Sequence, residues 1–415
     1  MLQSLLLLPQ HPAPITPTAL SAAFSPSISA CLSILKGSAS NTRLIIGIAS
    51  ADFHERLSGP RAQIYNEVEQ LLGGLYSLIS LICAQQNVEV VPGLPRAIDV
   101  RIVLLDYDSA RSLTTDQESE NSHGILVPGP IVDLSVFAST QRQWDHVFSV
   151  EGESGQKLLR DYLELANRIS PPLQATFHIV GGGLSMIQKA TQSIKSGSSV
   201  SHNVVAVGGT FDHLHAGHKL LLTATALLLQ PAVSPSDPPR RLIIGITGDE
   251  LLKNKSNASL LESWKARQKS AWSFLSAIMD FRPSSSTAVN INELDEPGPN
   301  GHCVHIRLSP SLSLNFVEIS DPFGPTITEE SISALVVSGE TRKGGAAVNE
   351  RRAVKEWKEL EVFEVDVLST DDDASGEVDE EFKNKLSSTG IRKQLAEKAE
   401  ERKKWNEKGS NEDTQ

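Results

Sequence analysis

The chain has 415 residues, of which 40% are hydrophobic and 21% are charged, so it is long and apolar enough for about two or three globular domains. Its 38 Lys and Arg against 50 Asp and Glu give a net charge of −12, which disfavours general attraction to nucleic acid or to an anionic membrane. We therefore expect any anionic ligand to be held by a local pocket.

The first residues, MLQSLLLLPQHPAP, lack the basic start of a secretory signal, and Pro9 breaks their apolar run. The sequence contains no run of ~18 uninterrupted apolar residues, so we expect no membrane span. The three cysteines, Cys31, Cys83 and Cys303, are few, distant and odd in number, which indicates a reducing compartment without a disulfide framework. We expect cytoplasmic localisation, with nuclear access as the alternative.

Residues 1–195 are predicted to form an N-terminal α/β domain. Its expected strands are 44–48 and 100–105, and its expected helices are 64–82 and 158–169. The phrase RLIIGI at 43–48 recurs at 241–246, and an acidic residue and a long helix follow each copy. Two interpretations of this recurrence stay open. One is a degenerate internal duplication, and the other is chance similarity, because buried strands use few residue types. We assign this domain no catalysis, and docking of protein partners is one hypothesis for its role.

A Ser-rich stretch at 193–202 separates this region from a second predicted domain at 202–396. Short β-branched runs alternate there with helical patterns: strands at 204–207, 242–247, 314–320, 334–338 and 363–368, and helices at 219–229, 262–279 and 348–360. Near-continuous apolar strands with helices between them predict a doubly wound, Rossmann-like parallel sheet covered on both faces.

Three polar segments interrupt or follow this pattern. The Pro-rich residues 231–239 predict an inserted loop, and the acidic run at 371–381 predicts a mobile connector, because its like charges repel. The charged tail at 397–415 is expected to continue a helix and to end in disorder.

The segment most informative about chemistry is VVAVGGTFDHLHAGHK at 204–219, a glycine-rich loop between a buried strand and a helix. Gly208 and Gly209 let the backbone approach a bulky anion, and the free N–H groups of a helix start favour phosphate. His215 and His218 are three residues apart, so both imidazoles can face one cleft and donate to phosphate oxygens as charge develops.

A zinc site is the alternative for these histidines, since His213 lies close to His215 and His218 in the sequence. No cysteine or further histidine stands nearby at ligand spacing, so we predict a site without a resident metal.

This segment resembles the (H/T)xGH nucleotidyltransferase superfamily, with His215-Ala216-Gly217-His218 preceded by Gly209-Thr210-Phe211-Asp212. Within that superfamily, residues 204–395 look like eukaryotic, fungal-type phosphopantetheine adenylyltransferases. The further matching phrases are GDELLKNK at 248–255, DPFGP at 321–325, VVSGETRKGG at 336–345 and SSTGIR at 387–392.

The resemblance implies transfer of AMP from ATP, accompanied by Mg²⁺, to 4′-phosphopantetheine, giving dephospho-coenzyme A and pyrophosphate in coenzyme A biosynthesis. It implies His215, His218 and Lys255 as catalytic residues, with Lys253 as the alternative to Lys255 for the phosphate contact. Arg342 and Lys343 are expected in a Gly-rich turn that brings cations to the triphosphate. The implied nucleotide-binding residues are Gly208, Gly209, Thr210, Phe211, Gly217, Lys253, Arg342, Lys343, Ser387, Ser388, Thr389 and Arg392.

Two other functions remain alternatives. A cytidylyltransferase acting on a phosphorylated alcohol shares the GTFD and HxGH blocks, but the closing phrase SSTGIR favours the adenylyltransferase. A non-catalytic nucleotide-binding scaffold is disfavoured by the intact His215, Gly217 and His218. No G-x-x-x-x-G-K-[ST] P-loop is present, so we predict a monofunctional transferase without a fused kinase.

Overall fold

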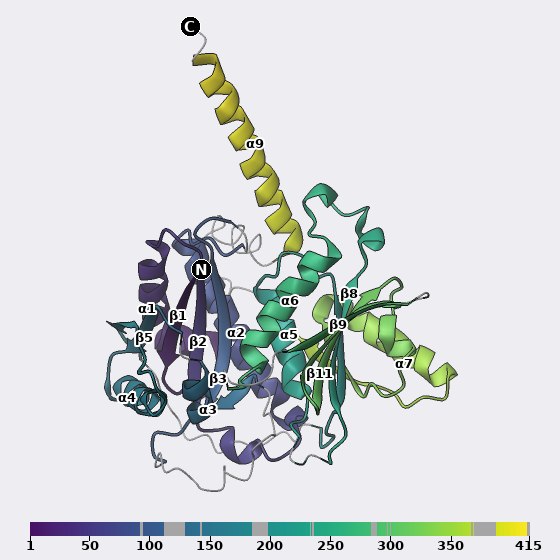
Figure 1. The fold of residues 1–415 in the computed structure, drawn as a ribbon, viewed down its shortest axis with the longest axis horizontal. Helices are drawn as coiled ribbons and strands as arrows, with labels where there is room; N and C mark the ends of the chain where they lie inside the picture. Colours follow the sequence, from purple (N-terminus) through teal and green to yellow (C-terminus); the bar gives the residue numbers. More distant parts are fainter. Residues whose placement is uncertain are drawn as a thin grey trace.

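The computed structural model describes residues 1–91, 94–111, 129–141, 143–184, 198–232, 234, 236–283, 289–296, 298, 300–366, 368 and 387–412. The predicted acidic connector at 371–381 lies outside these residues, as do residues 193–197 of the Ser-rich stretch. The described chain forms two α/β halves, each built on its own sheet (Figure 1).

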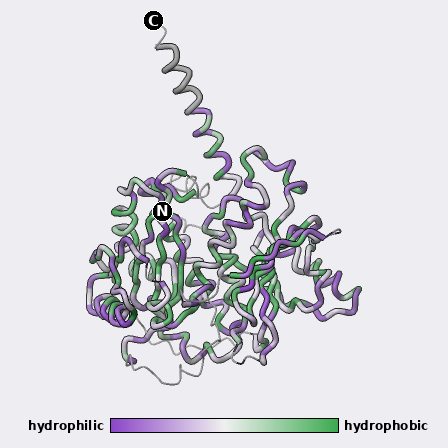
Figure 2. Tube along the Cα trace, viewed as in Figure 1, coloured by the Kyte–Doolittle hydropathy of each residue, from purple (hydrophilic) through white to green (hydrophobic). Residues whose placement is uncertain are grey.

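Within the described residues, the N-terminal sheet has six strands in the order β4-β3-β2-β1-β5-β6, and every pair is parallel. The strands are β1 (Leu2–Leu8), β2 (Thr42–Ser50), β3 (Ile98–Asp106), β4 (Ile131–Asp133), β5 (His146–Val150) and β6 (Thr176–Val180). The leucine run near the start of the sequence forms the interior strand β1, and its residues Leu5 to Leu8 are fully buried. Figure 2 shows hydrophobic stretches in the interior of both halves.

The described helices of this half are α1 (Pro17–Lys36), α2 (Tyr65–Gln85), α3 (Leu134–Thr140) and α4 (Glu153–Asn167). Two helical stretches, Pro17–Lys36 and Arg61–Gln85, are long and apolar enough to cross a membrane by length and composition. Core helices pass the same test, and 44% and 61% of the two tested windows are buried inside the protein.

The C-terminal sheet has seven described strands in the order β13-β12-β7-β8-β11-β10-β9. They are β7 (Val204–Gly209), β8 (Arg240–Thr247), β9 (Asn290–Asp295), β10 (His302–Ser309), β11 (Leu312–Ile319), β12 (Ala334–Ser338) and β13 (Glu361–Val365). Strands β13, β12, β7, β8 and β11 are parallel to one another, whereas β10 and β9 add an antiparallel edge. The predicted doubly wound α/β fold is therefore confirmed.

The helices of this half are α5 (Ala216–Leu228), α6 (Trp264–Met279), α7 (Arg342–Val354) and α9 (Ser388–Glu412). Helix α5 packs on α2 and helix α6 contacts β3, so α5 and α6 lie between the two sheets (Figure 1). Helix α9 projects away from both sheets.

The helix expected at 348–360 starts six residues earlier, at Arg342. Gly344 and Gly345, which indicate a turn in the sequence, lie in its first turns. A Cβ on Gly345 would stand 2.9 Å from Val362 of β13, so close packing of helix on strand explains that glycine. Arg342 and Lys343 therefore begin a helix and do not lie in a Gly-rich turn, which corrects the prediction.

Both sheets contain the same five-strand order, β3-β2-β1-β5-β6 in one and β11-β8-β7-β12-β13 in the other. The RLIIGI phrases occupy equivalent strands, β2 and β8. A duplication would leave this order, and unrelated Rossmann-like domains also share it. In the C-terminal half the strand order reverses between β7 and β12, the place where such sheets bind ligands.

The three cysteines are buried: Cys31 in α1, Cys83 in α2 and Cys303 in β10.

Candidate functional site

A cavity of about 700 Å³ opens beyond the carboxyl ends of β7, β8 and β12. Gly208 and Gly209 of β7, Thr247 of β8 and Ser338 of β12 contribute to its wall. Its volume lies in the ordinary range for small-molecule sites, roughly 300–1,000 Å³. The cavity thus lies at the switch point of the C-terminal sheet, between β7 and β12.

His215 and His218 meet in this wall. His215 is the residue before α5 and His218 lies in its first turn, so their rings stack with centroids 3.8 Å apart and planes at 24°. The Nδ1 atom of each ring is buried and has no hydrogen-bond partner within the protein.

Both imidazoles are uncharged at neutral pH. Burial, reinforced by the neighbouring His218, Lys219 and His213, holds the pKa of His215 well below its usual value. Burial, reinforced by His213, lowers the pKa of His218 to about 3. Each ring therefore offers one N–H donor to an anion without carrying its own positive charge.

Gly208 lets a ligand approach the backbone. A Cβ built on it would meet no atom within 4 Å, and the residue lines the cavity. The first N–H groups of α5, at Ala216 and Gly217, have no partner in the preceding turn and add the partial positive charge of a helix start. The strand, the glycines and the helix start form the strand–loop–helix element that the sequence predicted, and phosphate binding there stays a prediction.

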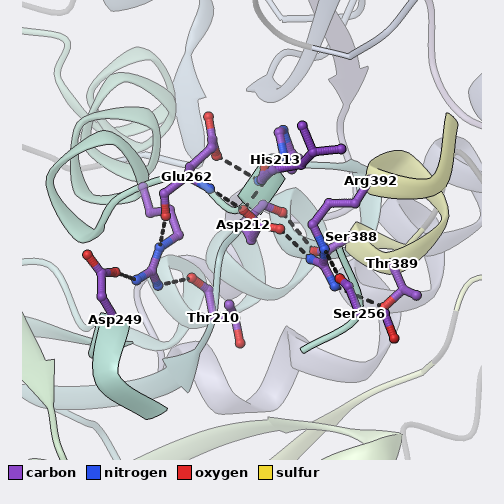
Figure 3. Close-up of polar contacts among 11 residues, drawn as sticks. Thr210, Asp212, His213, Asp249, Ser256, Glu262, Ser388, Thr389 and Arg392 are labelled. Carbon is purple, nitrogen blue, oxygen red and sulfur yellow. Dashed lines mark hydrogen bonds and ion pairs between the residues drawn. The ribbon is translucent and has the colours of Figure 1, made fainter. Parts of the chain in front are cut away.

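The loop between β7 and α5 is held in an unusual conformation. Phe211 and His213 have φ angles of +52° and +46°, a backbone region that residues other than glycine rarely adopt. Asp212 between them is fully buried, and its Oδ1 accepts a hydrogen bond from the Glu262 backbone N–H at 2.9 Å. The Glu262 carboxylate accepts a hydrogen bond from the His213 backbone N–H at 2.7 Å, so Glu262 holds both Asp212 and His213 (Figure 3).

The other oxygen of Asp212 binds Arg392 of the SSTGIR phrase, with Nη1 at 2.5 Å from Oδ2. Arg392 also donates from Nε to the Ser256 carbonyl at 3.0 Å and from Nη2 to Thr389 Oγ1 at 3.3 Å (Figure 3). Although Arg392 lines the cavity, these protein contacts occupy three of its nitrogens. In the structure it holds the loop in place.

A second buried arginine, Arg267 of α6, supports the same loop. It donates from Nη1 to the Thr210 carbonyl at 2.7 Å, and from Nη2 to the Thr247 carbonyl at 2.8 Å and to Asp249 Oδ1 at 2.6 Å. Sequence reasoning missed Arg267, Glu262 and the structural role of Asp212. The available signal was an arginine on the buried face of the predicted helix, three residues after Trp264 and four before Ala271.

The helix start at SSTGIR also faces the cavity. Ser387, Ser388 and Thr389 line it. Ser387 Oγ accepts from the Gly390 N–H at 3.1 Å, as a helix cap does, and Ser388 Oγ donates to the Asp212 carbonyl at 2.7 Å.

The predicted cations converge only in part. Lys255 lines the cavity, whereas the Lys253 ammonium pairs with Glu250 on the surface. The Arg342 guanidinium pairs with Glu364 and is 69% exposed, and neither Arg342 nor Lys343 belongs to the cavity wall.

Phe211 packs and does not line the cavity. Its ring is fully buried, with its centroid 5.3 Å from that of His218, and it would clash with a Cβ on Gly209. The Phe211 ring thus packs against the His218 ring within the protein interior.

The zinc alternative gains no ligand set. Within the described part of the chain, no three His, Cys, Asp or Glu side chains are grouped so that they could hold a metal ion. The His213 ring lies instead 2.9 Å from the Leu260 carbonyl.

The N-terminal part of the chain matches one family model. Residues 1–186 match the family model described as a domain of unknown function (DUF8446). The chain is 31% identical over 253 residues to an uncharacterised protein of Schizosaccharomyces pombe, a match that covers 61% of this chain and 66% of that protein.

Two further relatives are phosphopantetheine adenylyltransferases. That of Saccharomyces cerevisiae is 34% identical over 193 residues, 46% of this chain and 48% of that protein. That of Pyrobaculum aerophilum is 31% identical over 192 residues, 46% of this chain and 90% of that protein. The chain spans less than two thirds of the length of either yeast relative.

The fold defines a Rossmann-like α/β protein with a cavity at the switch point of its C-terminal sheet. Because the match covers nearly the whole archaeal protein, the chain belongs to the phosphopantetheine adenylyltransferase family.

Proposed function

We propose that this chain transfers AMP from ATP to 4′-phosphopantetheine, giving dephospho-coenzyme A and pyrophosphate. The observation that carries the proposal is the pair of stacked, uncharged imidazoles of His215 and His218 at the start of α5, in the wall of a nucleotide-sized cavity. The names of the archaeal and budding yeast relatives support the choice of substrates.

In this reaction a phosphate oxygen of 4′-phosphopantetheine forms a bond to the α-phosphorus of ATP. The bond from that phosphorus to the oxygen bridging it to the β-phosphorus breaks, and pyrophosphate leaves with the electron pair. The attacking phosphate is already an anion, so the protein needs neither a nucleophile nor a general base. Its task is to position the two phosphates and to stabilise the charge that develops between them.

The cavity residues suit that task. The imidazole N–H groups of His215 and His218 and the helix start supply fixed donors, and Lys255 supplies a positive charge. Because both side chains are partly buried in the cavity wall, solvent screens these interactions less than at an exposed surface.

Magnesium enters this proposal as the complex with ATP, where it neutralises part of the triphosphate charge. The carboxylates of Asp321, Glu340 and Asp366 line the cavity and are oxygen ligands of the kind Mg²⁺ prefers. Magnesium bound to nucleotide usually keeps several waters and takes one or two protein carboxylates, so one of these residues would suffice without the grouped ligand set that the described residues lack.

The test is an assay of the purified full chain with ATP, Mg²⁺ and 4′-phosphopantetheine, following pyrophosphate release and identifying dephospho-coenzyme A by mass. We expect ATP to be used in preference to CTP, and the product to remain without a further phosphate. His218→Ala should keep the wild-type circular dichroism and lose on the order of 10²–10³ in turnover. Preference for CTP would instead support a cytidylyltransferase, and nucleotide binding without any product would support a scaffold.

A further inference from the structure

The two halves of the chain meet at α5, the helix whose first turn carries the histidine pair. Lys219 directly follows His218 but is directed at the N-terminal half, and it is only 6% exposed. Its Nζ donates to Asp99 Oδ1 at 2.6 Å and to the Val100 carbonyl at 3.0 Å, both in β3. The first turn of α5 is therefore bonded to the sheet of the other half.

Asp99 lies between two cations. Arg101 donates to Asp99 Oδ2 from Nε at 2.9 Å and from Nη2 at 2.6 Å. Burial by itself would raise the pKa of Asp99, but Lys219 and Arg101 hold that pKa well below its usual range. The carboxylate stays charged, and a neutral replacement would leave Lys219 buried without its counter-ion.

The same cluster reaches α6. Arg101 Nη2 donates to Ser273 Oγ at 3.1 Å, and Nη1 donates to the Ser273 carbonyl. The β3 charge cluster, defined as Asp99 and Arg101, thus contacts both helices that lie between the sheets, but only the Asp99 contact reaches the histidine turn directly.

The N-terminal half also lies behind His215. A small cavity of about 40 Å³ adjoins this histidine and Lys219, and its other walls include Tyr76 and Ile79 of α2. Ile391 of the SSTGIR phrase contributes to the same wall. His215 lines both this cavity and the large one, so its ring lies between the N-terminal half and the proposed reaction site.

We propose that Asp99 is a positioning residue for AMP transfer: through its ion pair with Lys219, the N-terminal half fixes the start of α5 and thereby the two imidazoles. The inference rests on the proposed function for its kinetic consequence. An error of about 1 Å in the placement of groups around reacting atoms can cost on the order of 10²-fold in rate. It gives residues 1–184 a role as an internal support for the site.

The first test compares Asp99→Asn with Ser273→Ala in the full chain. Ser273→Ala removes a hydroxyl from the same interface and leaves the Asp99–Lys219 pair in place, so it is the matched control. We expect Asp99→Asn to lower kcat by roughly 10- to 100-fold with a much smaller change in KM for ATP, measured well below the unfolding temperature of each variant. Loss of overall stability alone would lower the folded fraction and leave the kcat of folded molecules unchanged.

The second readout does not depend on turnover. Amide hydrogen exchange in residues 215–222 should be faster in Asp99→Asn than in the wild type, and unchanged in Ser273→Ala. A wild type that makes no dephospho-coenzyme A would defeat the proposed function, and the exchange comparison would still decide the positioning role.

If Asp99→Asn does not fold, Lys219→Met removes the ion pair without leaving a buried unpaired lysine, and Asp99 keeps Arg101 as its partner. The same loss of kcat and the same faster exchange are expected. Wild-type kcat and wild-type exchange in a folded variant lacking the pair would overturn the inference.

Discussion

Arg392 and Asp212 are 180 positions apart in the sequence, yet Nη1 of the arginine is 2.5 Å from Oδ2 of the fully buried aspartate. Because Arg392 also donates to the Ser256 carbonyl, this one side chain joins the histidine loop, the segment after β8 and the start of α9. Three phrases that the sequence presents separately are one structural unit.

Asp212→Asn should therefore destabilise the chain strongly. The substitution leaves the Arg392 guanidinium buried without a counter-charge, and breaking such a pair costs about 3–5 kcal/mol. Urea unfolding at pH 7 measures the loss. Arg342→Gln removes the exposed pair with Glu364 and should change stability little. Equal effects of the two substitutions would show that the Asp212 pair has no special structural weight.

Acid should weaken the fold through the buried histidines. In the unfolded chain His218 titrates near pH 6.5, whereas burial lowers its pKa in the folded chain to about 3. Below pH 6.5 the unfolded chain binds more protons, so stability falls as the pH drops from 6.5 towards 3, by about 1.4 kcal/mol per pH unit for this residue.

Between pH 7 and pH 5, His218→Gln should accordingly lose about 2 kcal/mol less stability than the wild type, measured by urea unfolding at both pH values. His178→Gln, in the edge strand β6, should change the pH dependence less, because burial lowers the pKa of His178 less than that of His218. An unaltered pH dependence in His218→Gln would mean that the ring is not held neutral by burial.

Lys255 and Lys253 should separate cleanly in kinetics. Lys255→Ala removes the cation that lines the cavity and should lower kcat/KM for ATP by roughly 10²-fold, the order of loss seen when one charge-stabilising donor is removed. Lys253→Ala removes a surface partner of Glu250 and should leave kcat/KM within about twofold. A larger loss in Lys253→Ala would reverse the assignment of the two lysines.

Gly208 and Gly209 should respond differently to the same methyl group. In Gly208→Ala the Cβ enters open space in the cavity, so the unfolding temperature should stay unchanged while KM for ATP rises. In Gly209→Ala the Cβ lies 2.9 Å from the Phe211 ring, so the unfolding temperature should fall. Thermal unfolding and the pyrophosphate assay on both variants give the comparison, and matching behaviour of the two would contradict it.

The sequence predicted elements whose apolar pattern is continuous and bounded by turn residues. The strands β7 and β8 lie within a few residues of their predicted ends, because buried parallel strands are uninterrupted β-branched runs. β1 was missed because its core is leucine, which is common in helices and signals as well as in strands. The start of α7 was misplaced because Gly345 resembles a turn residue until Val362 is seen beside it.

The candidate site could be predicted as a local motif and not as an assembly. The spacing of His215 and His218 places both rings on one turn of a helix, and the structure brings them together. The contacts that hold this turn, from Arg392 and from Asp99, join residues 120 or more positions apart. Such pairs depend on how sheets and helices pack, and local periodicity carries no information about that.

The burial of all three cysteines has a consequence for handling the protein. Cys31, Cys83 and Cys303 are each at most 8% exposed, and burial raises the pKa of the Cys31 and Cys303 thiols, which keeps them protonated. A protonated, enclosed thiol neither attacks a disulfide nor is readily alkylated. The sulfhydryl end of a pantetheine compound would thus find no accessible partner for a mixed disulfide, and iodoacetamide should leave the folded chain unlabelled.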